Sequence, residues 1–184
     1  MHIFCRALIY LVREGGEDIK DFSAKIFLIL LCSLVLFSCT AKRSCREIFE
    51  EYSRSYGSLY SGVLYKSEAS EWEDGYISNE LFSSLYDGAD GKSERDRIEE
   101  YAVYLSSSME RFCEFGVFLC YGNTDAESVA KMCHRRIFLV SETKSDGDYS
   151  YEENSIVMIF GRYVVYAIQP DRRASERAIS AAFN

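Results

Sequence analysis

The side chains that come nearest to a catalytic pair in this 184-residue chain are a thiol and an imidazole at adjacent positions, Cys133 and His134. A cysteine nucleophile needs a base within hydrogen-bonding distance. The apolar spacing around this pair predicts a helix, in which successive side chains point about 100° apart, so the two cannot pair with each other. We expect a core thiol beside a histidine near the end of a helix.

A serine and a lysine three residues apart form a second motif of catalytic type, Ser128-Val129-Ala130-Lys131. It resembles the S-x-x-K motif of penicillin-binding enzymes, but the companion motifs S-D-N and K-T-G do not occur in the chain. The chain is also far shorter than that fold requires. Ser128 and Lys131 lie beside the apolar stripe of the predicted helix, where we expect solvated side chains.

The acidic segments lack the spacing of a metal site. Neither residues 87–91 (D-G-A-D-G) nor residues 146–148 (D-G-D) place oxygen ligands at the positions of an EF-hand loop. The chain contains no C-x-x-C, H-E-x-x-H, G-x-S-x-G, Walker loop or dinucleotide-binding glycine motif. We therefore predict no catalytic residue, no metal and no cofactor.

A region rich in tyrosine, serine and glutamate extends from Glu50 to Tyr86 and includes Trp72. Its aromatic rings could stack on a glycan or a peptide, and they could equally supply the core of the domain. The net charge of −8 argues against nucleic acid as a partner, because phosphates require clustered lysine and arginine. The 14 tyrosines and 12 phenylalanines indicate a folded domain.

A lysine followed by an apolar run and a cysteine, Lys25 to Cys39 (K-I-F-L-I-L-L-C-S-L-V-L-F-S-C), indicates where the protein resides. The uncharged run is shorter than the roughly 20 residues that span a bilayer as a helix. Its order of charged, apolar and small residues is that of a secretory signal. The end of the run resembles the lipobox of bacterial lipoproteins, in which the cysteine receives diacylglycerol and becomes the first residue; Leu36, Ser38 and Cys39 match.

We therefore predict a signal peptide over residues 1–38, a lipidated Cys39 in a tether over residues 39–43, and one domain over residues 44–184. The lipid would hold the protein to the extracytoplasmic side of the cell membrane. The alternatives are an ordinary buried helix and a retained N-terminal anchor. Residues 1–24 are longer and more acidic than a usual leader start, which suggests an over-extended start, with initiation at a codon such as Leu11, Val12 or Ile19.

Four cysteines remain for the domain after Cys39 is assigned to lipid and Cys5 and Cys32 to the leader. They are Cys45, Cys113, Cys120 and Cys133. The rise per residue of a strand and of a helix places Cys133 between the levels of the two strand cysteines. We predict free, buried thiols, with Cys113–Cys133 as the pair if a disulfide forms.

Hydrophobic periodicity predicts the elements that position these residues. Helices are predicted over 44–56, from Ser78, over 124–137 and after Asp171, and strands over 101–105, 112–120, 156–160 and 163–168, the last two joined by a Gly161-Arg162 turn. A helical stripe at 98, 101, 102 and 105 is the rival interpretation of the first strand. Residues 57–66 are ambiguous, and 141–154 are predicted as a polar loop.

Two successive strand-strand-helix units can merge into one antiparallel sheet. We predict an α+β fold of this kind, a two-layer sandwich with both helices on one face and the N-terminal helices at its edge.

Two passages of the domain carry a family resemblance. Residues 109–137 (M-E-R-F-C-E-F-G-V-F-L-C-Y-G-N-T-D-A-E-S-V-A-K-M-C-H-R-R-I) and 156–168 (I-V-M-I-F-G-R-Y-V-V-Y-A-I) resemble an uncharacterised family of Gram-positive lipoproteins catalogued as a domain of unknown function (number 4358). Its recurrent features are an acidic residue entering an apolar strand (Glu114), a helix start at Thr124-Asp125 and a G-x-Y-V hairpin from Gly161. The resemblance covers about residues 44–182 and implies a membrane-tethered extracytoplasmic protein; it assigns no activity, cofactor or catalytic residue.

These observations predict a lipoprotein without enzymatic activity whose domain binds an envelope protein or glycan or stabilises an assembly. The alternative is a small cell-envelope enzyme that acts on peptide or glycan through scattered acidic residues. A carboxylate-lined cleft would favour the enzyme, and an exposed apolar sheet face would favour the binding module.

Overall fold

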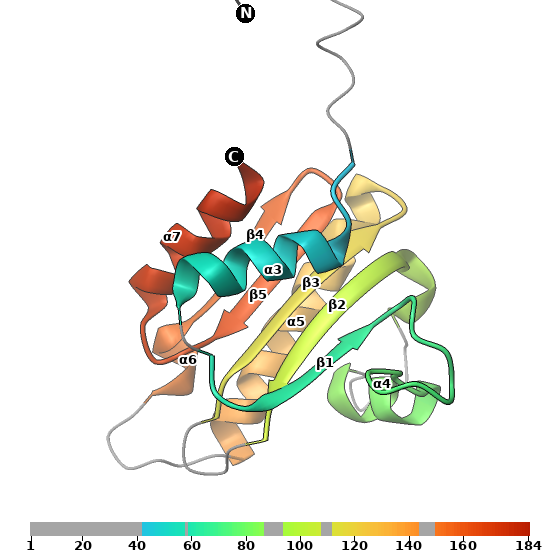
Figure 1. The fold of residues 1–184 in the computed structure, drawn as a ribbon, viewed down its shortest axis with the longest axis horizontal. Helices are drawn as coiled ribbons and strands as arrows, with labels where there is room; N and C mark the ends of the chain where they lie inside the picture. Colours follow the sequence, from blue (N-terminus) through green and yellow to red (C-terminus); the bar gives the residue numbers. More distant parts are fainter. Residues whose placement is uncertain (1–41, 58, 87–93, 108–111, 144–149) are drawn as a thin grey trace, which may run out of the picture. The chain divides into compact units, whose positions relative to one another are not determined.

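The computed structural model describes residues 42–57, 59–86, 94–107, 112–143 and 150–184. The predicted signal peptide, Cys39 and the acidic segments 87–91 and 146–148 lie outside the described residues. The chain divides into two compact units, Met1–Lys42 and Arg43–Asn184. The second unit is the α+β domain (Figure 1).

The domain is built from one antiparallel sheet and its surrounding helices. The strands are β1 (Gly62–Lys66), β2 (Ile98–Ser106), β3 (Glu114–Cys120), β4 (Ser155–Phe160) and β5 (Tyr163–Ile168), in the order β1-β2-β3-β5-β4. The described helices are α3 (Cys45–Tyr56), α4 (Asn79–Tyr86), α5 (Asn123–Thr143), α6 (Tyr151–Asn154) and α7 (Arg172–Phe183), with a 3-10 turn η1 (Arg95–Arg97). No helix among the described residues is long and apolar enough to cross a membrane.

The predicted α+β class and the two strand-strand-helix units, β2-β3-α5 and β4-β5-α7, are confirmed. Residues 98–105 are strand rather than helix, and the ambiguous segment before Lys66 contributes β1, which pairs with β2 at the edge of the sheet. The segment predicted as a polar loop contains the end of α5 and the short helix α6.

Helices cover both faces of the sheet, which corrects the expectation of two layers with both helices on one face. Alternate residues of β5 show this, because Val164, Tyr166 and Ile168 pack in the core on the α5 side, whereas Val165 and Ala167 pack with α3 and α7. Figure 1 shows α3 and α7 in front of the strands and α5 behind them. The physical reason is that every residue of β3 is buried, and a strand buried on both faces must be covered on both.

Local capping fixes where the domain begins and where its last helix begins. The hydroxyl of Ser44 accepts a hydrogen bond from the Glu47 backbone N–H (3.1 Å), and the Glu47 carboxylate accepts one from the Ser44 N–H (2.8 Å). This capping box satisfies two donors that the start of α3 would leave unpaired. At α7, the Asp171 carboxylate accepts from the Ala174 N–H (2.9 Å), as its predicted N-cap role requires.

Candidate functional site: a buried carboxylate network

Glu114, the first residue of β3, is the one acidic side chain that is buried among the described residues, with no exposed surface. Removing a carboxylate from water is costly unless charged partners and hydrogen bonds compensate. The groups around Glu114 therefore decide what this site can do.

Arg136 of α5 is the charged partner of Glu114. Its Nε lies 3.0 Å from Oε1 and 3.2 Å from Oε2 of the carboxylate, and its Nη2 lies 2.7 Å from Oε2. The side chain of Arg136 is only 14% exposed. This forked geometry is the strongest form of carboxylate-arginine pairing, and it joins β3 to α5 through the core.

Two tyrosines complete the network. The phenol of Tyr166 in β5 donates a hydrogen bond to Oε1 of Glu114, and the phenol oxygen of Tyr86 in α4 lies 2.7 Å from that of Tyr166. Since Tyr166 gives its only proton to Glu114, Tyr86 is the donor in the second bond. One buried chain of polar groups thus connects α4, β5, β3 and α5.

Gly116 makes room for this arrangement. It lies opposite Tyr166 in the ladder between β3 and β5. A Cβ at this position would come within 2.1 Å of the Tyr166 ring, closer than any real contact. The absence of a side chain lets the ring lie across β3, where it stacks on Phe118 with ring centroids 6.1 Å apart and planes 7° apart. The glycine therefore allows the phenol to reach Glu114.

The electrostatics keep the two phenols and the guanidinium of the network in fixed protonation states. Burial, and then the Glu114 carboxylate, raise the pKa of Tyr86 and of Tyr166 well above the usual value. For Arg136, burial lowers the pKa, but the neighbouring Glu114 more than offsets this, and the pKa rises. Both phenols are therefore neutral and Arg136 is charged across the physiological pH range.

The Glu114 carboxylate accepts hydrogen bonds on both of its oxygens from groups of the domain itself. A general base must be free to take a proton from a substrate within hydrogen-bonding reach. Glu114 is enclosed and already engaged, so its chemistry is to hold elements together rather than to transfer protons.

A second group of buried polar side chains lies on the opposite face of the sheet. The Tyr52 phenol is 3.4 Å from the hydroxyl of Ser175, and the buried side chain of Gln169 lies close to both Tyr52 and Cys113. Burial raises the pKa of Tyr52 and of Cys113 above the usual values. These groups join α3 to α7, and like the first network they are enclosed by the fold.

The structure buries the cysteines Cys45, Cys113, Cys120 and Cys133 and joins none of these four in a disulfide. Cys113 packs in the core on the α3 and α7 side and Cys133 in the core on the α5 side, so the sheet separates the pair that was considered for a disulfide. Burial raises the pKa of Cys120 to about 12 and that of Cys133 well above the usual value. Such thiols form little thiolate and are weak nucleophiles.

The structure does not assemble the motifs of catalytic type into a site. Cys133 is buried whereas His134 is exposed on the same helix, as expected. The Ser128 hydroxyl donates to the Thr124 carbonyl (3.4 Å), and Lys131 is exposed. Within the described ranges, no group of three or more His, Cys, Asp or Glu side chains could hold a metal ion.

The aromatic residues between Glu50 and Tyr86 were predicted either to form the core or to bind a partner, and the structure shows both buried and exposed ones. Tyr52, Phe82 and Tyr86 belong to the core. Trp72 is 92% exposed in the loop that follows β1. Only the tryptophan, among these four, is placed to meet a partner in solution.

Arg136 is the functional residue that sequence reasoning missed. The helix predicted over 124–137 places Arg136 next to its C-terminal end, but α5 continues to Thr143. Arg136 follows Cys133 by three residues and precedes Val140 by four, which places it beside the buried stripe of α5. A charged residue at that spacing, together with Glu114 in an apolar strand, was the signal of a buried pair.

The fold and the site define a class, an antiparallel α+β domain with helices on both sheet faces and an enclosed, hydrogen-bonded glutamate-arginine pair. Comparison with known proteins finds no matching family, no matching curated protein and no matching solved structure. The resemblance to the Gram-positive lipoprotein family therefore stays a prediction.

Proposed function

We propose that this protein is an extracytoplasmic lipoprotein, tethered to the cell membrane through Cys39, whose domain binds an envelope protein or glycan and is not an enzyme. The sequence Lys25 to Cys39, with its lipobox-like end, is the observation that carries the proposal. The folded domain begins at Arg43, directly after the short segment that follows this cysteine. A folded domain immediately behind an acylated cysteine is the arrangement of a tethered module.

The enclosure of Glu114 supports a binding role for the domain rather than a catalytic one. Glu114 is engaged by Arg136 and Tyr166 within the core and has no access to a substrate. The thiols with raised pKa values are also enclosed. What the domain offers to other molecules is its outer surface, including the exposed Trp72.

The lipid assignment is tested by metabolic labelling with an alkyne fatty acid, followed by fractionation of membranes. Cys39→Ala should abolish the label and release or mislocalise the protein, because it removes the acceptor thiol. Cys32→Ala, a cysteine change inside the same leader, is the matched control and should keep both label and location. Membrane retention of the unchanged protein without acyl labelling would contradict the proposal.

The binding role is tested in intact cells with a photo-crosslinking amino acid placed at Trp72, and at the exposed Arg177 of α7 as the matched control. We expect a discrete crosslinked adduct from the Trp72 position and none from Arg177. An excess of the protein without the crosslinking amino acid should compete this adduct away. Catalytic turnover of a peptide or glycan by the purified domain, with no adduct, would favour the enzyme instead.

A further inference from the structure

The point where the chain joins the domain is held firmly at one end of the sheet. The Arg43 carbonyl accepts a hydrogen bond from the phenol of Tyr163 (2.6 Å), the first residue of β5. The Arg43 guanidinium donates to the carbonyl of Ala182 near the end of α7 (2.6 Å). These bonds, with the capping box at Ser44, fix the start of the domain beside the β4–β5 turn.

The distance from this point to Cys39 is limited by covalent geometry. Arg43 is four residues after Cys39 (43 − 39 = 4), and a fully extended chain spans at most about 3.6 Å per residue, or roughly 14 Å here. Helix α5 starts at this end of the sheet and has 21 residues, so at about 1.5 Å per residue it extends roughly 30 Å away. A lipid on Cys39 therefore holds Arg43 within this distance of the bilayer, whereas the far end of the domain can extend roughly 30 Å beyond it.

The near end also carries the side chains that suit a lipid interface. Tyr121, just after β3, is 61% exposed, and Ile159, just before the β4–β5 turn, is 48% exposed. Arg162 of the β4–β5 turn lies beside Tyr121, and its guanidinium donates to the carbonyls of Cys120 (3.2 Å) and Tyr121 (3.4 Å). Exposed tyrosine and aliphatic groups beside an arginine match the boundary between head groups and hydrocarbon.

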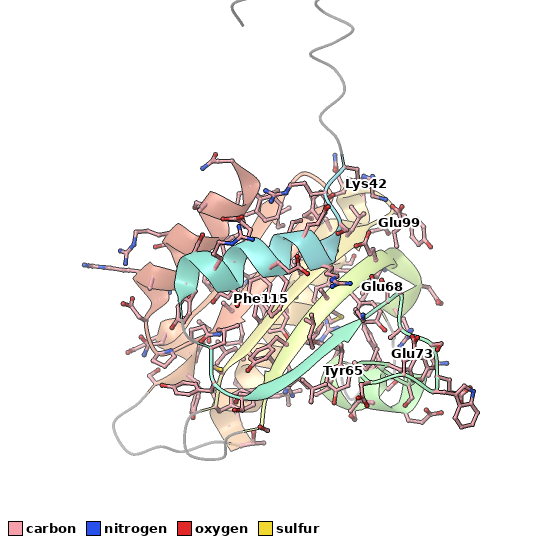
Figure 2. The ribbon with its side chains drawn as sticks, viewed as in Figure 1. Lys42, Tyr65, Glu68, Glu73, Glu99 and Phe115 are labelled. Atoms are coloured by element: carbon pink, nitrogen blue, oxygen red, sulfur yellow. The ribbon has the colours of Figure 1, made fainter. Side chains whose placement is uncertain are left out.

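The arginine at this end is partly neutralised by an acidic neighbour. Arg162 lies 3.0 Å from the Glu99 carboxylate at the start of β2. Figure 2 shows Glu99 toward the upper end of the domain and Tyr65 toward the lower part. A paired arginine contributes little net attraction to anionic lipids, so the apolar contact of Tyr121 and Ile159 and the short tether carry the interaction.

We propose that the end of the domain formed by Arg43, the β4–β5 turn and Tyr121 rests on the lipid head groups, with Tyr121 and Ile159 at the interface. The partner of this surface is the layer of lipid head groups. The proposal rests on the proposed lipidation of Cys39. The opposite end, toward which α5 extends and where Phe138 is 55% exposed, faces away from the membrane and is left open to an envelope partner.

The experiment uses the acylated protein, extracted from membranes and reconstituted in vesicles of phosphatidylglycerol and phosphatidylethanolamine that contain a lipid with a nitroxide on its head group. Tyr121→Cys and Phe138→Cys, at positions of similar exposure, each carry a fluorophore; the native domain thiols are buried and do not compete. We expect the nitroxide to quench the probe at position 121 several-fold more strongly than the probe at 138.

The outcomes separate this inference from the proposed function. Acylated protein that floats with the vesicles but shows equal quenching at both positions, or stronger quenching at 138, overturns the orientation and leaves the lipoprotein intact. Protein that mass spectrometry shows to lack an acyl group overturns both. Far-UV circular dichroism checks each variant, and Ile159→Cys replaces Tyr121→Cys if that variant does not fold.

Discussion

At the scale of single residues, the Glu114–Arg136 pair is the feature whose removal has the clearest consequence. A buried ion pair contributes little net stability compared with apolar residues of the same shape, but breaking it leaves an uncompensated charge in the core. The Tyr166 phenol bonds to the same carboxylate and cannot replace the lost positive charge. Single and double substitutions should therefore behave very differently.

We expect Arg136→Met to lower the free energy of unfolding by about 3–5 kcal/mol, because Glu114 stays buried without its partner. The double variant Glu114→Leu with Arg136→Met removes both charges and should lose clearly less. Urea unfolding followed by circular dichroism measures both. If the double variant lost as much as the single variant, the charge on Glu114 would not be the cause.

Alkaline pH offers a second test at residue scale, through Cys120. Burial raises the pKa of this thiol from 9.0 to about 12, so the unfolded chain releases its proton at a lower pH than the folded domain does. The folded state then binds more protons between about pH 9 and 12, and stability falls as pH rises, with a limiting slope of about 1.4 kcal/mol per pH unit per proton.

Cys120→Ala should therefore make the decline of unfolding free energy above pH 9 shallower, although the apolar burial lost at this site lowers stability at pH 7. Urea unfolding under reducing conditions at several pH values measures the slope. An unchanged slope in the variant would show that the thiol does not carry this dependence.

At the scale of elements, the pairing of β3 with β5 depends on a glycine opposite a tyrosine. Gly116→Ala would place a methyl group against the Tyr166 ring, and overpacking of this kind typically costs about 1–3 kcal/mol. Gly122→Ala is the matched control, because its Cβ would lie 3.4 Å from a carboxylate oxygen of Asp125 in a looser setting. Thermal unfolding should rank Gly116→Ala well below the control.

The elements themselves were largely predictable because their signals are local. The two-residue Gly161–Arg162 turn, the alternation through β2 and the capping box at Ser44 each lie within a few residues, and each is present in the structure. The layer arrangement was not predicted, because local spacing does not show which face of a sheet a distant helix covers; its sequence signal is the almost continuous apolar run of β3 and β5, which are buried on both faces.

The site was predictable only in part, because its partners are distant in sequence. Glu114 stood out as a charge in an apolar strand, but Arg136, Tyr166 and Tyr86 come from three other elements. Local spacing predicts a helix that ends at residue 137, directly after Arg136. The charge of Arg136 is instead compensated by Glu114 across the core, which lets the helix continue.

At the scale of the whole molecule, the sheet separates two cores that different helices cover. Phe82 and Tyr86 of α4 pack with α5 residues on one face, and α3 packs with α7 on the other, where Phe115 lies beneath α3 (Figure 2). The polar network reaches only the first face. A change in that network should therefore act mainly on one side of the domain.

Tyr86→Ala provides the test, because it removes both the hydrogen bond to Tyr166 and the edge-on ring contacts with Phe118 and Tyr166 that hold the short helix α4. Native-state hydrogen exchange should show amides of α4 losing protection first, while α3 and α7 keep theirs, since Tyr86 is one of the two buried residues of this short helix, with Phe82. Tyr86→Phe, which keeps the ring, should have a much smaller effect. Equal loss of protection in α3 and α4 would mean that the two cores unfold as one cooperative unit despite the sheet between them.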